Sequence, residues 1–148
     1  MPTLAFGSAG ATIAISAGVP ATTDSTGFGA LSYTVIKDIT DLGMVGPEAS
    51  IILHSPLNES VTYKVKGPTN NGAMDIKGAK PTSADPGHLL LVQAVASPNS
   101  YAIKITLVNG ALIYFQTKVT SYKTNVGNNG QLVAMESKLE VDGAVIFA

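Results

Sequence analysis

Hydrophobic and polar residues alternate over several short stretches of the chain, and such alternation predicts β-strands that bury one face. The clearest pair covers residues 101–108 and 111–122. Between them stands Asn109-Gly110, the dipeptide most typical of a tight β-hairpin turn, preferentially of type I′. The same pattern predicts further strands over residues 11–16, 31–39, 48–54, 61–66, 73–80 and 132–141. In the last of these strands Val133 is expected to face inward, and Asp142-Gly143 is expected to form the turn that follows it.

Residues 53–71 are rich in Pro, Asn and Gly, which normally mark loops. Inside this stretch, however, Val61, Tyr63 and Val65 alternate with polar residues, as in a strand. We therefore expect a long loop or a hairpin arm over about residues 53–71, between two strands of the core.

One stretch, at about residues 85–96, has helical periodicity. Asp85 is a suitable N-cap and Pro86 occupies the favoured first position, while Ser97-Pro98 ends the helix. So short a helix is marginal alone, so it must dock an apolar stripe on a sheet. The expected stripe consists of Leu89, Val92 and Ala96, and Leu90 and Ala94 widen it.

These elements predict a mainly β protein with two packed antiparallel sheets, arranged as a β-sandwich or a partly closed barrel. One flanking helix and the arm complete the expected fold. No repeat or change of composition divides the chain, so residues 1–148 are expected to form a single domain. Residues 17–30 are expected to be a loop, and residues 3–10 a flexible arm.

Charged residues make up only 13% of the chain, against about 25% in a typical globular domain. A surface with so few charges is either covered by small polar residues or covered by other protein. Cysteine is absent, which excludes disulfides and thiolate metal sites, and all nine basic residues are lysine. Without arginine or a basic cluster, a dedicated nucleic-acid reader is not expected. Neither a signal peptide nor a membrane span is expected.

No catalytic motif is evident. His54 and His88 are the only histidines, neither at metal-ligand spacing, and His88 is expected to be solvated in the first turn of the helix. Glu136 and Glu140 share one strand face with Lys138 between them, which indicates a solvated or interface face rather than a catalytic pair. We expect no catalytic, cofactor-binding or metal-binding residue and no enzyme activity.

From about residue 39 to residue 143, the order of elements resembles that of the major tail tube proteins of long-tailed, non-contractile bacteriophages of the lambda type. A strand with alternating apolar residues leads through Asn-Gly to a strand with a Phe, and a later strand closes on a Val-x-Gly sequence. The residues that carry the resemblance are Ile103, Ile105, Asn109, Gly110, Phe115, Val119, Ser121, Leu139, Val141 and Gly143.

The resemblance implies a structural virion protein without a cofactor. Such subunits form hexameric rings, and the rings stack into the tail tube through which the genome enters the host. The inner sheets of the six subunits line the lumen. The implied partners are other copies of the chain and the terminator, tape measure and distal tail proteins, with DNA only as transient cargo in the lumen. The implied location is the virion tail, assembled in the cytoplasm of the bacterial host.

Two groups of residues are expected to make contacts in such an assembly. The first group lies in the arm and would contact another subunit or ring: Leu57, Asn58, Glu59, Tyr63, Lys64 and Lys66. The second group lies on strand faces that would face the lumen or a neighbouring subunit: Lys104, Lys118, Glu136, Lys138 and Glu140.

Two alternatives stay open. Needle-tube proteins of type VI secretion systems use the same fold, so the chain could be one of these. A β-sandwich binding or adhesin module is the other alternative. Such a module should expose aromatic side chains on one face, whereas the tyrosines of this chain fall mostly at core-like positions.

Overall fold

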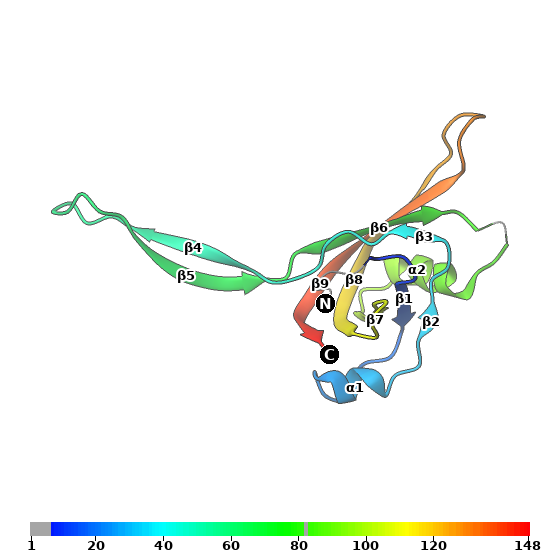
Figure 1. The fold of residues 1–148 in the computed structure, drawn as a ribbon, viewed down its shortest axis with the longest axis horizontal. Helices are drawn as coiled ribbons and strands as arrows, with labels where there is room; N and C mark the ends of the chain where they lie inside the picture. The colour runs from blue at the N-terminus through cyan, green and yellow to red at the C-terminus, as the bar shows by residue number, and fades with distance from the viewer. Residues whose placement is uncertain (1–6, 82) are drawn as a thin grey trace, which may run out of the picture.

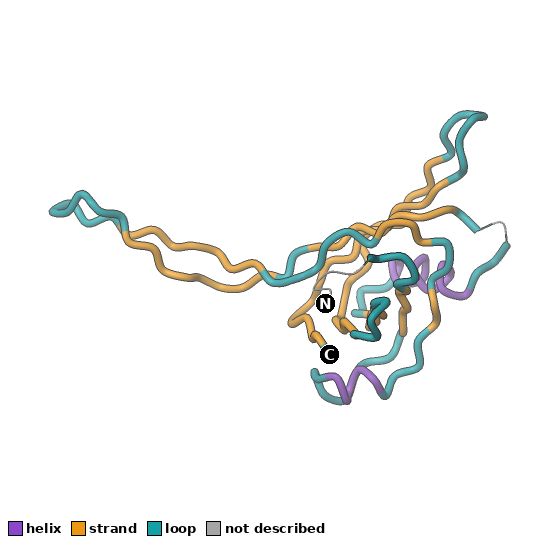
Figure 2. Tube along the Cα trace, viewed as in Figure 1, coloured by secondary structure: helices purple, strands orange, loops and turns teal. Residues whose placement is uncertain are grey.

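A computed structural model of the chain describes residues 7–81 and 83–148. Seven strands form one curled antiparallel sheet in the order β2-β1-β7-β8-β9-β6-β3, and two more, β4 and β5, pair only with each other in the part described (Figure 1). Figure 2 shows this pair as an arm that projects from a compact body. The strands are β1 Thr12–Ser16, β2 Thr34–Val35, β3 Ile39–Asp41, β4 Glu48–His54, β5 Tyr63–Asn70, β6 Ala73–Ala79, β7 Tyr101–Thr106, β8 Leu112–Asn125 and β9 Ala134–Phe147.

The predicted fold class is confirmed: the protein is mainly β, with a curled antiparallel sheet, a second sheet and a flanking helix. The second sheet is the arm itself, β4 and β5, and it begins at Glu48, earlier in the chain than expected. The helix α2 spans Pro86–Ala96, close to its predicted bounds.

The core of the body lies between one face of the curled sheet and α2. Side chains that alternate along the strands meet there and are almost fully buried, among them Phe115 of β8 and Leu139 of β9. Helix α2 packs against β8, β1 and β2, and it contributes Leu91 and Ala94 to the same cluster. The body therefore buries a continuous core using only its own residues.

The predicted buried stripe of α2 is wrong at its centre, Leu89, Val92 and Ala96, although Ala94 is buried as expected and Leu90 is partly buried against the core. Leu91, Ala94 and His88 face the core, whereas Leu89 and Val92 remain 49% and 48% exposed. Apolar residues surround this helix on all sides, so periodicity alone could not select the buried face. Gly87 helps to choose it, because a Cβ there would lie 2.5 Å from the carbonyl oxygen of Val35. The predicted N-cap is present: an Asp85 carboxylate oxygen accepts from the His88 amide at 3.3 Å.

Residues 17–30 are not all loop, as had been expected. They contain a second helix, α1 at Ser25–Gly29, whose N-cap Asp24 accepts from the Gly27 amide at 2.8 Å. Two glycines give this helix little intrinsic stability. Packing supports it instead, because the Phe28 ring stacks on Tyr114 with centroids 5.6 Å apart. Helix α1 thereby covers part of the sheet face opposite the core.

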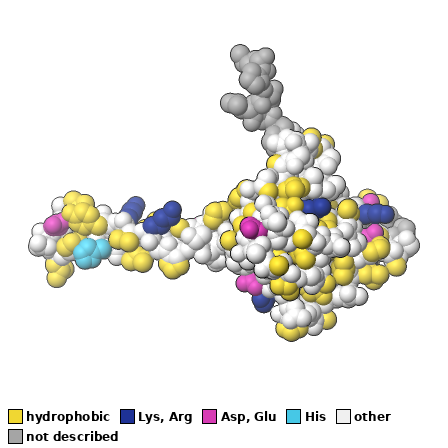
Figure 3. Space-filling model, turned by 90° about the horizontal axis from the view of Figure 1, so that it is seen from below, with side chains coloured by type: hydrophobic (Ala, Val, Ile, Leu, Met, Phe, Trp, Pro, Cys, Tyr) yellow, Lys and Arg dark blue, Asp and Glu magenta, His cyan; other side chains and the backbone are white. Residues whose placement is uncertain are grey.

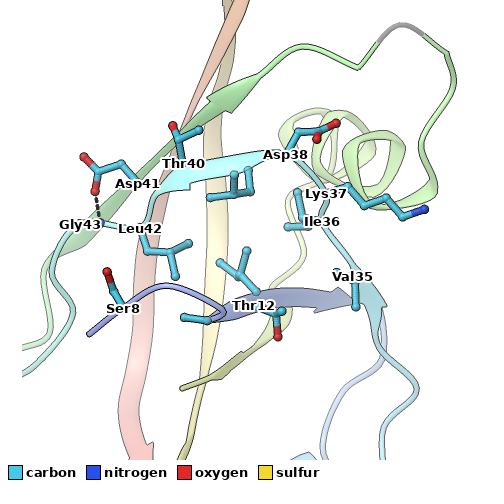
Figure 4. Close-up of a pocket in the computed structure, with 13 residues that line it drawn as sticks. Ser8, Thr12, Val35, Ile36, Lys37, Asp38, Thr40, Asp41, Leu42 and Gly43 are labelled. Carbon is cyan, nitrogen blue, oxygen red and sulfur yellow. Dashed lines mark hydrogen bonds between the residues drawn. The ribbon is translucent and has the colours of Figure 1, made fainter. Parts of the chain in front are cut away.

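The strand predicted over residues 31–39 is divided into β2 and β3, which form the two opposite edges of the sheet. Asp38 interrupts it with a φ of 61°, a conformation that Asp tolerates better than most residues. The connection between β2 and β3 spans the gap between the two edges. A surface hollow of about 540 Å³ marks this gap, lined by Thr12, Ile36 and Leu42 among others (Figure 4).

Two turn predictions are also corrected. The hairpin at Asn109-Gly110 is present, but only Gly110 has a positive φ, of 90°, so the turn is not type I′. The expected turn at Asp142-Gly143 is absent, because β9 continues to Phe147 past an irregularity at Gly143. Val133, expected to face inward, precedes β9 and is 42% exposed. Of the expected N-terminal arm, residues 3–6 lie outside the described residues.

Candidate functional site

The arm is a twisted ribbon of β4 and β5 with two different faces. Antiparallel partners point to the same side, so the register assigns each side chain to a face. One face carries Ile52 opposite Val65 and His54 opposite Tyr63. The other face carries Ile51 opposite Lys66 and Leu53 opposite Lys64. Figure 3 shows the lysines of the arm on one side and hydrophobic side chains along the other.

Both faces of the arm leave apolar side chains in solvent. Ile51, Ile52, Leu53 and Val65 are 56%, 54%, 65% and 56% exposed. A two-stranded hairpin is marginally stable by itself, and contiguous exposed apolar surface normally marks an interaction site. The arm is therefore the part of this chain that most clearly requires a partner.

The structure brings all six expected arm residues together but separates them by face. Leu57, Asn58 and Glu59 form the tip between β4 and β5, where Leu57 is fully exposed. The Tyr63 hydroxyl donates to the Glu59 carboxylate at 2.6 Å, and this bond raises the pKa of Tyr63. Tyr63 thus lies on the uncharged face, away from Lys64 and Lys66.

Four of the five expected strand residues form a charged face on β8 and β9, on the side of the sheet away from the core. Lys118 donates to the Asp142 carboxylate at 2.8 Å and to the Ser100 hydroxyl at 2.9 Å. These bonds, with that of Ser100 to Asp142, hold the pKa of Asp142 below its usual value. Lys138 lies 3.6 Å from Glu140.

On this charged face, side chains of opposite charge lie opposite each other on neighbouring strands. The register places Asp75 of β6 opposite Lys138 and Lys77 opposite Glu136. Lys118 of β8 lies opposite Glu140 of β9. The charges therefore cancel locally, and the face offers no cluster of free lysines to a polyanion. Its members are Asp75, Lys77, Lys118, Lys123, Glu136, Lys138, Glu140 and Asp142.

Lys104 lies apart from this face. It belongs to β7, is half-buried, and holds its ammonium nitrogen 5.1 Å from the centre of the Tyr33 ring. Burial, with a smaller contribution from neighbouring Tyr114, raises the pKa of Tyr33 to about 12. Lys104 therefore fastens the segment after α1 to the sheet.

The expectation that His88 is solvated is wrong. It is 4% exposed, with Nδ1 2.8 Å from the Tyr122 hydroxyl and Nε2 2.8 Å from the Lys37 carbonyl oxygen. A carbonyl only accepts, so Nε2 donates its proton to the Lys37 carbonyl oxygen, while Nδ1 is hydrogen-bonded to the Tyr122 hydroxyl. His88 thus ties α2 to β8 and to the β2–β3 connection. His54 lies far away, exposed on the arm.

Sequence reasoning missed the outer face of α2. Leu89, Val92 and Val95 are exposed there, at 49%, 48% and 39%, and no charged residue occurs anywhere in Pro86–Ala96. A surface helix normally carries charges on its solvent side, so this one has an unusual outer face. The eleven uncharged residues were a signal visible in the sequence.

The described residues bring no three His, Cys, Asp or Glu side chains close enough to hold a metal ion. Among the helices of residues 7–81 and 83–148, none has the length and apolar character needed to cross a membrane. Of the five tyrosines, only Tyr63 is markedly exposed; Tyr101 and Tyr114 are buried, and Tyr33 and Tyr122 are half-buried. Phe147, at the end of β9, is also exposed, at 61%, whereas Tyr63 lies on the arm. The residues described, 7–81 and 83–148, thus show no group of several exposed aromatic side chains such as a binding module would need.

No family model matches the chain, and no curated protein matches its sequence. Solved structures do match. A chain of the anti-feeding prophage baseplate, determined with sixfold symmetrisation, aligns with a TM-score of 0.75 and 11% identity, over 100% of this chain and 97% of that one. A chain of the virion of a native gene transfer agent aligns with a TM-score of 0.58 and 13% identity, over 78% of this chain and 88% of that one. The fold is therefore one used by chains of a prophage baseplate and of a gene transfer agent virion.

Proposed function

We propose that this protein is a structural subunit of a phage-tail-type particle, in which copies form hexameric rings that stack into a tube. The tube would be the conduit for genome delivery, as expected of a tail tube protein. The arm is the observation that carries the proposal. It exposes Ile51, Ile52, Leu53 and Val65 in solvent, and residues that no part of the body covers need other subunits.

The fold match supports this assignment. The similar chain in the prophage baseplate matches over nearly its full length, and that particle is symmetric about a sixfold axis. Rings built from one repeated contact satisfy unpaired strand edges and apolar arms by placing them against the next copy. The scarcity of charged residues is consistent with a chain whose surface is largely covered in this way.

The charged face fits a lumen wall better than a nucleic-acid grip. Each Lys or Arg that contacts a phosphate adds affinity, and a conduit must not retain its cargo. Here Lys118 is held by Asp142, and Lys138 lies near Glu140. In the assembled particle, we assign this face to the lumen and the arm to the contacts between subunits or rings. The other tail proteins would meet the two ends of the tube.

A second candidate is a subunit of a single baseplate ring, because the match of highest TM-score given above belongs to a baseplate. Both candidates predict rings, but only a tube subunit predicts stacking to indefinite length. Electron microscopy of the purified, concentrated protein separates them. Long tubes support the tube subunit, and isolated rings support the baseplate subunit. A protein that stays monomeric at high concentration contradicts both.

A further inference from the structure

The outer face of α2 is defined here as Leu89, Val92 and Val95, and the uncharged face of the arm as Ile52, His54, Tyr63 and Val65. We infer that the uncharged face of the arm of one copy packs on the outer face of α2 in the next copy. This inference rests on the proposed function, and it names the surface that receives the arm.

The chemistry of the two surfaces matches. Neither surface carries a lysine, aspartate or glutamate, and the Glu59 carboxylate at the tip of the arm accepts a hydrogen bond from Tyr63. Ile52, Val65, Leu89 and Val92 are each about half exposed in the free subunit, at 54%, 56%, 49% and 48%. Burying them against each other removes apolar area from water without stranding a charge. The opposite face of the arm does not suit α2, because burying it there would place Lys64 and Lys66 against a helix that has no acidic residue.

The placement of the two surfaces also fits. The arm leaves the body on one side, and α2 lies toward the other side along the longest axis of the molecule (Figure 1). One copy therefore cannot bring its own arm to its own helix. A contact between two different patches on opposite sides is head-to-tail, and it generates a closed ring or an open filament rather than an isolated dimer.

The buried side of α2 also supports this assignment. Its core side is already occupied, with Leu91 and Ala94 buried against the sheet and His88 bonded to Tyr122. Rotation of α2 to bury Leu89 would break these contacts and would move Gly87 from its close approach to Val35. The outer face must therefore be covered by something that arrives from outside the subunit.

Disulfide trapping tests the contact directly, because the natural chain has no cysteine. The full chain carrying Ile52→Cys and Val92→Cys is assembled, oxidised and run on a denaturing gel without reductant. We expect a ladder of linked subunits that collapses to monomer on reduction, whereas Ile52→Cys alone links at most two subunits. The matched control pairs Lys66→Cys with Val92→Cys and should give little ladder, because Lys66 lies on the other face of the arm.

A charge exchange supplies a second measurement that does not depend on oxidation. Ile52→Glu and Val92→Lys should each abolish assembly, and the double variant should restore it, with the same thermal midpoint of the monomer throughout. Normal assembly of the two single variants would overturn the contact while leaving the proposed function intact. Equal ladders from Ile52 and Lys66 would also overturn it. Failure of the natural chain to assemble would overturn both the contact and the proposed function.

Discussion

The body and the arm of this protein solve the same problem in opposite ways. Both are antiparallel β-structure that is rich in apolar side chains. In the body the sheet curls around its own core, so Phe115 and Leu139 are completely buried. In the arm the two strands form a single layer on which nothing else of the subunit packs, so Ile52 and Val65 stay half exposed. Under the proposed function, this difference means that folding depends on the body and assembly on the arm, so changes in the two segments should have separable consequences.

Removal of the arm should have the largest effect on assembly. Ala49 and Thr69 are paired, so replacing residues 50–68 with Asn-Gly leaves a short hairpin. We expect no rings or tubes by electron microscopy, because the exposed apolar contacts are gone. The free energy of unfolding of the body should change by only about 0.5 kcal/mol, as is usual away from a core. Normal tubes from this variant would show that the arm is not needed for the contacts between subunits or rings.

Truncation in the core should have the largest effect on folding. Phe115→Ala removes a fully buried ring and should lower the free energy of unfolding by about 3–5 kcal/mol. Urea denaturation of dilute monomer measures this loss. The matched arm variant Ile52→Ala should leave monomer stability nearly unchanged and should weaken assembly instead. Equal destabilisation by both variants would contradict the separation of body from arm.

The two histidines offer a smaller contrast of the same kind. His88→Leu leaves the Tyr122 hydroxyl and the Lys37 carbonyl without their partner. Both hydrogen bonds are only partly buried, so the cost should lie near the lower end of the about 1–3 kcal/mol expected for an unpaired buried polar group. We therefore expect a clear loss of monomer stability in urea. His54→Leu on the arm serves as the control and should leave the urea midpoint of the monomer in place. A loss of stability in His54→Leu but not in His88→Leu would contradict the structural role assigned to His88.

The smallest expected effect is at the surface ion pair of the body. Asp142→Asn should cost less than about 1 kcal/mol, because Lys118 and Asp142 are both about half exposed. The folded-state pKa of Asp142 is lowered, so its contribution is present above the unfolded pKa and disappears as the pH falls through the lowered folded value. Unfolding curves measured from pH 7 downward should show the natural chain and the variant converging in acid. If the natural chain and Asp142→Asn still differed in stability in strong acid, the charge of Asp142 could not be the cause of the difference.

Local sequence signals were sufficient to predict an element of the fold wherever they favoured one type of structure over the others. Alternation at Val61, Tyr63 and Val65 predicted β5, and Asp85-Pro86 predicted the start of α2. The buried face of α2 could not be predicted, because Leu89 and Leu91 are equally apolar and the close approach of Gly87 to Val35 helps to decide between them. The contact is tertiary, so no local pattern contains it.

The candidate site was predictable in part for the same reason. Arm residues could be identified from their position between strands, but the division of Tyr63 from Lys64 and Lys66 depends on the register of β4 with β5. Lys118 was visible as an outward-facing residue, whereas its bond to Asp142 depends on Asp142 lying within β9, paired with Gln116 of β8, and not in a turn. Helix α1 escaped prediction because Phe28 packs on Tyr114, which lies far along the chain.

The arm continues directly from β3 and into β6, which are themselves paired, so a pull on its tip is delivered into the sheet along the strand direction. All seven residues of β6 are paired with β9. A load along the strand direction shears these hydrogen bonds, so they must break together and not one after another from an end. In the assembly proposed above, tension would therefore pass from copy to copy without unzipping the subunits that carry it.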